Sequence, residues 1–235
     1  MEQYEGSGPL LGLVLAASVG VLAAVTVLPV TSPALAATLI GDSPKAYWYL
    51  SRGSAFVALA LLWVSMMLGL LITDKLSRSW PGAAAAFAIH EYASLLGIAF
   101  AGFHALVLLG DRYIAYQPVQ ILVPFASSNF RPIWVGVGQL CLYVWILVSG
   151  SFYVRRRIGQ GAWKLIHYAS FFIFVVALMH GLGSGSDTGN AFAQAFYWLS
   201  GGSVLFLTAY RIAASLAGPE TWTPGREAAP RPPDL

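Results

Sequence analysis

The stretch "HEYASLLGIAFAGFH" runs from His90 to His104 inside an apolar segment long enough to cross a membrane. A second stretch, "HYASFFIFVVALMH", runs from His167 to His180 in another such segment, and together the two hold all four histidines. An ionisable side chain inside a membrane-spanning segment is costly and therefore points to a functional site. The two pairs indicate both the kind of fold and the chemistry to look for.

The composition around these stretches is that of a membrane protein. Of the 235 residues, 57% are hydrophobic and only 10% are charged. The single cysteine, Cys141, lies in an apolar run without a partner for a disulfide, a zinc site or a C-x-x-C-H haem attachment, so we interpret it as a small buried apolar residue. A net charge of +3, dispersed along the chain, does not indicate nucleic-acid binding.

Six segments have the roughly 20 mostly apolar residues that a spanning helix needs. They are approximately 9–30, 47–72, 83–110, 132–154, 162–184 and 190–217. We predict an all-α integral membrane six-helix bundle over residues 1–217, followed by a Pro-rich tail at 218–235. The first segment is interpreted as a retained helix rather than a cleaved signal peptide, because Glu2 and Glu5 precede it without any Lys or Arg.

The basic residues predict the orientation of the bundle. One side carries both termini and nine basic residues: Lys75, Arg78, Arg155, Arg156, Arg157, Lys164, Arg211, Arg226 and Arg231. The other side has only Lys45, Arg52, Arg112 and Arg131. Since basic residues concentrate on the cytoplasmic side, both termini should be cytoplasmic, in a cell (inner) membrane. The long outer connection at 111–131 is rich in apolar residues, so we expect a lid that lies in the membrane interface.

The spacing of the histidines places them in two layers. His90 and His104 are fourteen residues apart, which leaves them about 40° from a common helix face and about 21 Å apart along the axis. His167 and His180 are thirteen apart, with a similar rise of about 20 Å but an offset of about 140°, which a bend, local overwinding or different approach angles would have to absorb. The third and fifth spans run parallel, so His90 should lie level with His167, and His104 level with His180.

Two imidazoles per layer fit the two axial positions of a haem iron. Two stacked haems would then use every histidine, His90 with His167 on the inner side and His104 with His180 on the outer side. The alternative is four separate core histidines that bond to neighbouring groups. A zinc site fits less well, because neither layer has a cysteine or a nearby Asp to complete a tetrahedral set, and "HEYAS" is not the H-E-x-x-H of a metalloprotease.

H-x13-H on a third span and H-x12-H on a fifth resemble the ferric-reductase-like transmembrane domain, over about residues 45–217. That family includes ferric-chelate reductases, NADPH oxidases and the haem subunit of bacterial periplasmic methionine-sulfoxide reductase. The resemblance implies that His90, His104, His167 and His180 ligate two b-type haems. "YLSRGSA", with Arg52, also resembles a family feature in which an Arg meets an outer haem propionate. Arg112 and Arg131 are weaker candidates for the same role.

The chain departs from the ferric reductases and NADPH oxidases after its last span. It has neither a G-x-G-x-x-G after a strand nor room for a flavin and nicotinamide domain, so the electron donor should be a separate protein or a quinol. The sequence also allows a flavin to bind at the cytoplasmic face.

Three functions follow from these observations. The leading one is an electron-transferring cytochrome, the haem subunit of a membrane oxidoreductase that passes single electrons to an acceptor or redox partner outside. The second is a terminal reductase that reduces ferric chelate or oxygen at the outer haem. The third is a non-redox structural or transport subunit.

Overall fold

The computed structural model describes residues 26–27, 30–40, 45–128 and 130–217. Nearly all of the expected first span and the whole tail at 218–235 lie outside these residues. Within them the chain is helical, without a β-strand. Five helices are long and apolar enough to cross a membrane.

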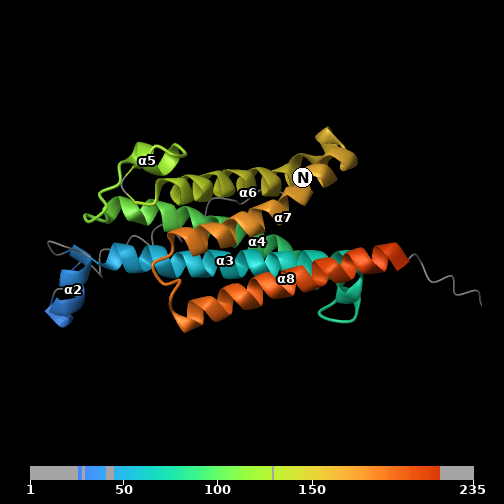
Figure 1. Cartoon of the computed structure of the whole chain (residues 1–235), viewed down its shortest axis with the longest axis horizontal. Helices are drawn as coiled ribbons and strands as arrows, with labels where there is room; N and C mark the ends of the chain where they lie inside the picture. The colour runs from blue at the N-terminus through green and yellow to red at the C-terminus, as the bar shows by residue number, and fades with distance from the viewer. Residues whose placement is uncertain (1–25, 28–29, 41–44, 129, 218–235) are drawn as a thin grey trace, which may run out of the picture.

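The five long helices lie side by side along the long axis of the molecule (Figure 1). They are α3 (Ala46–Thr73), α4 (Ala83–Leu106), α6 (Pro132–Ile158), α7 (Gln160–Ser184) and α8 (Ala191–Ala217). Their bounds fall within a few residues of the predicted spans, because long apolar runs between polar breaks mark such helices clearly. Helix α4 ends four residues before the predicted 110, and α6 continues four residues beyond the predicted 154, through Arg155–Arg157. Basic side chains are favourable in the last turn of a helix, where they face its negative dipole end.

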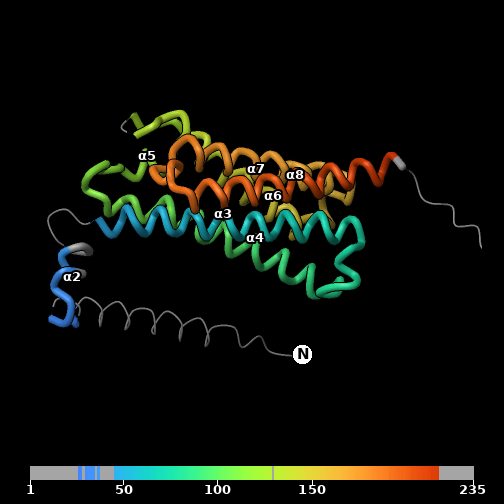
Figure 2. The backbone as a smooth tube through the Cα atoms, turned by 60° about the horizontal axis from the view of Figure 1, so that its bottom comes forward, coloured from blue at the N-terminus to red at the C-terminus, as the bar shows by residue number. Residues whose placement is uncertain are grey.

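Helices α4 and α7 run parallel to each other and antiparallel to α3, α6 and α8 (Figures 1 and 2). The connection between α6 and α7 is the single residue Gly159, whose φ of 85° is costly for any residue with a Cβ. The parallel arrangement of the two histidine-bearing helices, which the layer prediction required, is therefore present.

Helix α3 is the most enclosed of the five. Buried residues make up 39% of its most apolar window, against 11% for α4, α7 and α8. It packs most extensively on α4 and also contacts α7 and α8, while α6 packs mainly on α7. The core that these helices share includes Leu62, Met66, Trp145 and Ile173.

The segment at 111–131 folds back over one end of the bundle. It contains the short helix α5 (Pro118–Leu122), with Pro118 in its first turn, and Ile114, Tyr116 and Ile121 are buried against Trp48 and neighbouring apolar residues. Burial raises the pKa of the Tyr116 hydroxyl above its ordinary value. At the same end lies the short helix α2 (Pro33–Ile40), which falls between the first two predicted spans.

Candidate functional site

The structure brings the four histidines together in two pairs. The ring centroids of His90 and His167 are 6.1 Å apart, and those of His104 and His180 are 6.2 Å apart. Each pair joins α4 to α7, and each is composed of the two residues that the layer prediction placed at the same depth. Helix α7 is continuous between its two histidines despite their offset of about 140° on an ideal helix.

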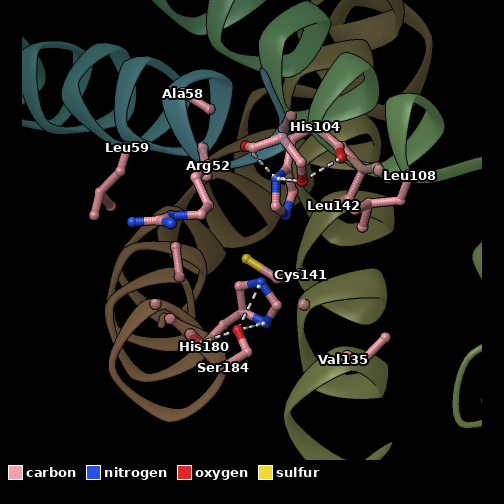
Figure 3. A pocket seen from close by; sticks show the side chains of 18 of the residues that line it. Arg52, Ala58, Leu59, His104, Leu108, Val135, Cys141, Leu142, His180 and Ser184 are labelled. Atoms are coloured by element: carbon pink, nitrogen blue, oxygen red, sulfur yellow. Dashed lines mark hydrogen bonds between the residues drawn. The ribbon is translucent and has the colours of Figure 1, made fainter. Parts of the chain in front are cut away.

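Each pair lines its own cavity. The cavity at His104 and His180 has a volume of about 220 Å³ and the cavity at His90 and His167 about 670 Å³. Small-molecule pockets measure about 300–1,000 Å³, so the second cavity lies within that range and the first is smaller. Figure 3 shows His104 and His180 facing each other across the first cavity, with Arg52 at its side.

Three of the four rings have a fixed orientation. Nδ1 of His90 lies 2.8 Å from the main-chain oxygen of Ser65, Nδ1 of His104 lies 2.8 Å from that of Ser51, and Nδ1 of His180 lies 2.7 Å from that of Trp134. A carbonyl oxygen only accepts hydrogen bonds, so Nδ1 must carry the proton in these rings. The lone pair is then on Nε2, the tautomer that suits a metal ligand held by its other ring nitrogen.

His167 is held differently. Its ring stacks on Trp163, with centroids 5.3 Å apart and an angle of 28° between the planes. Within the described residues, no carbonyl oxygen accepts a hydrogen bond from its Nδ1. Trp163 and Lys164 also line the cavity of the His90–His167 pair.

The dimensions of the pairs fit a metal ion between two imidazoles. Imidazole nitrogens bind metal ions at about 2.0–2.1 Å, and adding the ring radius on each side gives a centroid separation of about 6 Å. The described residues contain no group of three or more His, Cys, Asp or Glu side chains that would hold a metal ion alone. The nitrogen donors available between α4 and α7 are therefore two imidazoles per cavity.

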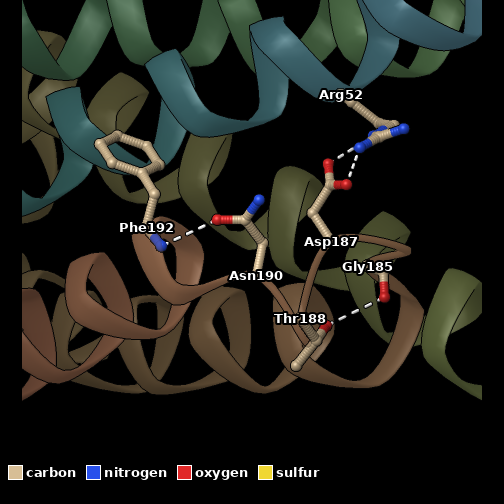
Figure 4. A network of polar contacts seen from close by, with 6 residues as sticks. All are labelled: Arg52, Gly185, Asp187, Thr188, Asn190 and Phe192. Atoms are coloured by element: carbon tan, nitrogen blue, oxygen red, sulfur yellow. Dashed lines mark hydrogen bonds and ion pairs between the residues drawn. The ribbon is translucent and has the colours of Figure 1, made fainter.

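Arg52 lies at the cavity of the His104–His180 pair, where its guanidinium makes an ion pair with Asp187 (Figure 4). Asp187 belongs to the segment between α7 and α8 and also lines this cavity. A haem propionate at Arg52 would share this guanidinium with Asp187. This contact joins residues 135 positions apart, so no local sequence pattern indicates it.

Arg112 and Arg131 do not line either cavity. Arg112 is exposed. Arg131 is also exposed, its guanidinium donating to the main-chain oxygen of Gly183 and lying 5.7 Å from the ring centroid of Phe130. Of the three candidates, only Arg52 is placed to meet a ligand between His104 and His180.

Two features of the site were not predicted. Trp145, at the middle of α6, lines both cavities together with Leu62. Phe171 lines only the cavity of the His90–His167 pair, and Phe174 is buried in the core. Ser51 and Ser65 were missed as partners of the histidines, although their spacing of fourteen residues repeats that of His90 and His104.

No protein-family model, curated protein or solved structure matches the chain. The likeness to the ferric-reductase-like domain therefore rests on the histidine spacing and the position of Arg52.

Proposed function

We propose that the chain is a dihaem b-type cytochrome, the haem subunit of a membrane oxidoreductase that moves single electrons between a cytoplasmic or quinol donor and an acceptor outside. The observation that carries the proposal is the pairing of all four histidines in two layers, at 6.1 and 6.2 Å between ring centroids. His90 and His167 would hold the inner haem, and His104 and His180 the outer haem. Iron in each haem supplies one-electron redox chemistry when bound.

The chain's own residues would position the two groups. The carbonyl oxygens of Ser65, Ser51 and Trp134 keep three imidazoles in the tautomer whose Nε2 can bind iron. Arg52 would offer its guanidinium to an anionic propionate of the outer haem. Both cavities are lined mostly by apolar surface, which suits the faces of a porphyrin ring.

The 111–131 segment covers the outer cavity, and this favours an electron-transferring subunit over a terminal reductase. Ile114, Tyr116 and Ile121 of the 111–131 segment line this cavity and are buried. A ferric chelate would need an open cleft above His104 and His180, whereas an electron relay to a docked protein does not. The direct reduction of a small acceptor is therefore the second candidate.

The first test is the absorption spectrum of the purified protein. We expect b-type haem bands in the reduced-minus-oxidised difference spectrum and two haems per chain by pyridine haemochrome assay. The absence of b-type bands would overturn both redox functions and favour a non-redox role for the buried histidines. One haem per chain would contradict the two-layer arrangement.

A further inference from the structure

Two serines of α3 contact the two histidines of α4 in the same way. The hydroxyl of Ser51 lies 2.9 Å from Nδ1 of His104, and the hydroxyl of Ser65 lies 3.1 Å from Nδ1 of His90. Both serines are buried, with 3% and 5% of their surface exposed. A buried serine on an apolar helix usually bonds only to a carbonyl of its own helix, so these contacts need a separate explanation.

Each serine holds its histidine at two points. The Ser51 hydroxyl donates to the main-chain oxygen of His104 at 3.0 Å, and the Ser65 hydroxyl donates to that of His90 at 3.3 Å. With its proton used in this bond, each hydroxyl oxygen is left to accept from the ring N–H. The Nδ1 proton is thus shared between the serine's hydroxyl and its main-chain oxygen.

The repetition follows from the packing of α3 on α4. Ser51 and Ser65 are fourteen residues apart on α3, and His90 and His104 are fourteen apart on the antiparallel α4. Equal spacing on two antiparallel helices places the same contact twice, about 21 Å apart. The histidines of α7 are held differently. His180 bonds to the Trp134 main-chain oxygen at 2.7 Å, and the hydroxyl that lies 3.4 Å from its Nδ1 belongs to Ser184 of its own helix. His167 stacks on Trp163.

We propose that Ser51 and Ser65 are positioning residues that each set the reduction potential of one haem, Ser51 that of the outer haem and Ser65 that of the inner haem. The inference rests on the proposed function. A hydrogen-bond acceptor at Nδ1–H makes Nε2 a stronger electron donor to a bound metal. Stronger donation stabilises the ferric state, so each serine hydroxyl lowers the potential of the haem in its own layer.

The experiment is a redox titration of the purified membrane protein and its Ser51→Ala and Ser65→Ala variants, followed by absorption and by the low-spin ferric electron paramagnetic resonance signals. We expect Ser51→Ala to raise the potential of the outer haem alone, and Ser65→Ala to raise that of the inner haem alone. The shift should be partial, because the main-chain oxygen at each position still accepts from Nδ1. The affinity for the affected haem should fall about 10- to 100-fold.

Two controls separate the hydroxyl from packing. Ser51→Thr and Ser65→Thr keep the hydroxyl and should keep the wild-type potentials and haem content. Ser200→Ala removes a fully buried hydroxyl that bonds only within α8, and should shift neither haem.

The outcomes distinguish this inference from the proposed function. Wild-type protein without haem would refute the function itself. Wild-type protein with two haems whose potentials do not change in the Ala variants, or change equally in both layers, would overturn the role of the serines alone. If Ser51→Ala lost the outer haem outright, recovery in Ser51→Thr would support the inference, and failure to recover would overturn it.

Discussion

The ring of His180 lies directly against Gly138 on α6. A Cβ built at Gly138 would be 2.4 Å from Nδ1 of His180, so no larger residue fits while this nitrogen bonds to the Trp134 main-chain oxygen. The histidine spacing alone did not reveal this requirement. The space for the His180 ring beside Gly138 results from the packing of α6 on α7, which cannot be derived from a single sequence.

We predict that Gly138→Ala displaces His180 and removes the outer haem while the inner haem stays. Overpacking of this kind costs about 1–3 kcal/mol of stability. Haem content per chain, with the spectrum of the haem that remains, measures the effect. Gly150→Ala on the same helix is the matched control, because a Cβ there meets nothing within 4 Å. Equal haem content in the two variants would contradict the prediction.

The Arg52–Asp187 pair allows a second prediction at this scale, because the two charges have opposite effects on a nearby iron. Arg52→Ala should lower the potential of the outer haem, since it removes a cation and leaves the Asp187 carboxylate unpaired at the cavity. Asp187→Asn should raise that potential, and the double variant should lie between the two. Redox titration of the three variants measures this. If Arg52 only extends its charged group to the membrane surface, the potential of the outer haem should be unchanged in all three variants.

At the scale of elements, the 111–131 segment is attached to α6 through three consecutive carbonyls. The side-chain amide of Gln139 donates to the main-chain oxygens of Gln120 and Ile121, both at 2.7 Å. The hydroxyl of Tyr143, one turn further along α6, donates to that of Leu122. These carbonyls lie at the end of α5, where no helical donor follows. The 111–131 segment, the lid, is therefore attached to α6 by hydrogen bonds in addition to its apolar contacts.

We predict that the Gln139→Leu/Tyr143→Phe double variant opens this lid more often. Each lost hydrogen bond is worth about 1 kcal/mol, so the open fraction should rise at least about fivefold. The measurement is maleimide labelling of Ile121→Cys, a position only 7% exposed, in a Cys141→Ala background. Tyr113→Phe is the control, because Tyr113 is 94% exposed and its ring is not part of the attachment. An unchanged labelling rate would show that apolar burial alone holds the lid.

The elements differ in how far the sequence predicted them. The five described spans were predictable because an apolar run of sufficient length has few alternatives. The pairing of His90 with His167 followed from parallel helices and needed no side-chain detail. The contacts of Ser51 and Ser65 were not predictable in the same way, because a serine in an apolar run gives no sign of which helix it faces. Asp187 was missed for a related reason, since its partner is remote in sequence.

At the scale of the whole molecule, the helix directions place the 111–131 segment and the α7–α8 connection at one end and Arg155–Arg157 at the other (Figure 1). We predict that the end with the three arginines is cytoplasmic. A cysteine placed at the exposed Tyr113 should then react with a membrane-impermeant maleimide in intact cells. A fluorescent reporter that folds only in the cytoplasm should be active when fused after Leu235. The opposite pattern in both assays would reverse the assignment of inner and outer layers.

The last prediction concerns the two layers as independent units. His90 and His104 lie about 21 Å apart along α4, a distance that no single iron can bridge, so under the proposed function each cavity would take its own haem. Replacing His104 or His180 with alanine should remove the same spectral component and halve the haem content. Replacing His90 or His167 should remove the other component. If the His90 and His104 variants lost one component while the His180 variant lost the other, the pairs seen at 6.1 and 6.2 Å would not be the ligand pairs.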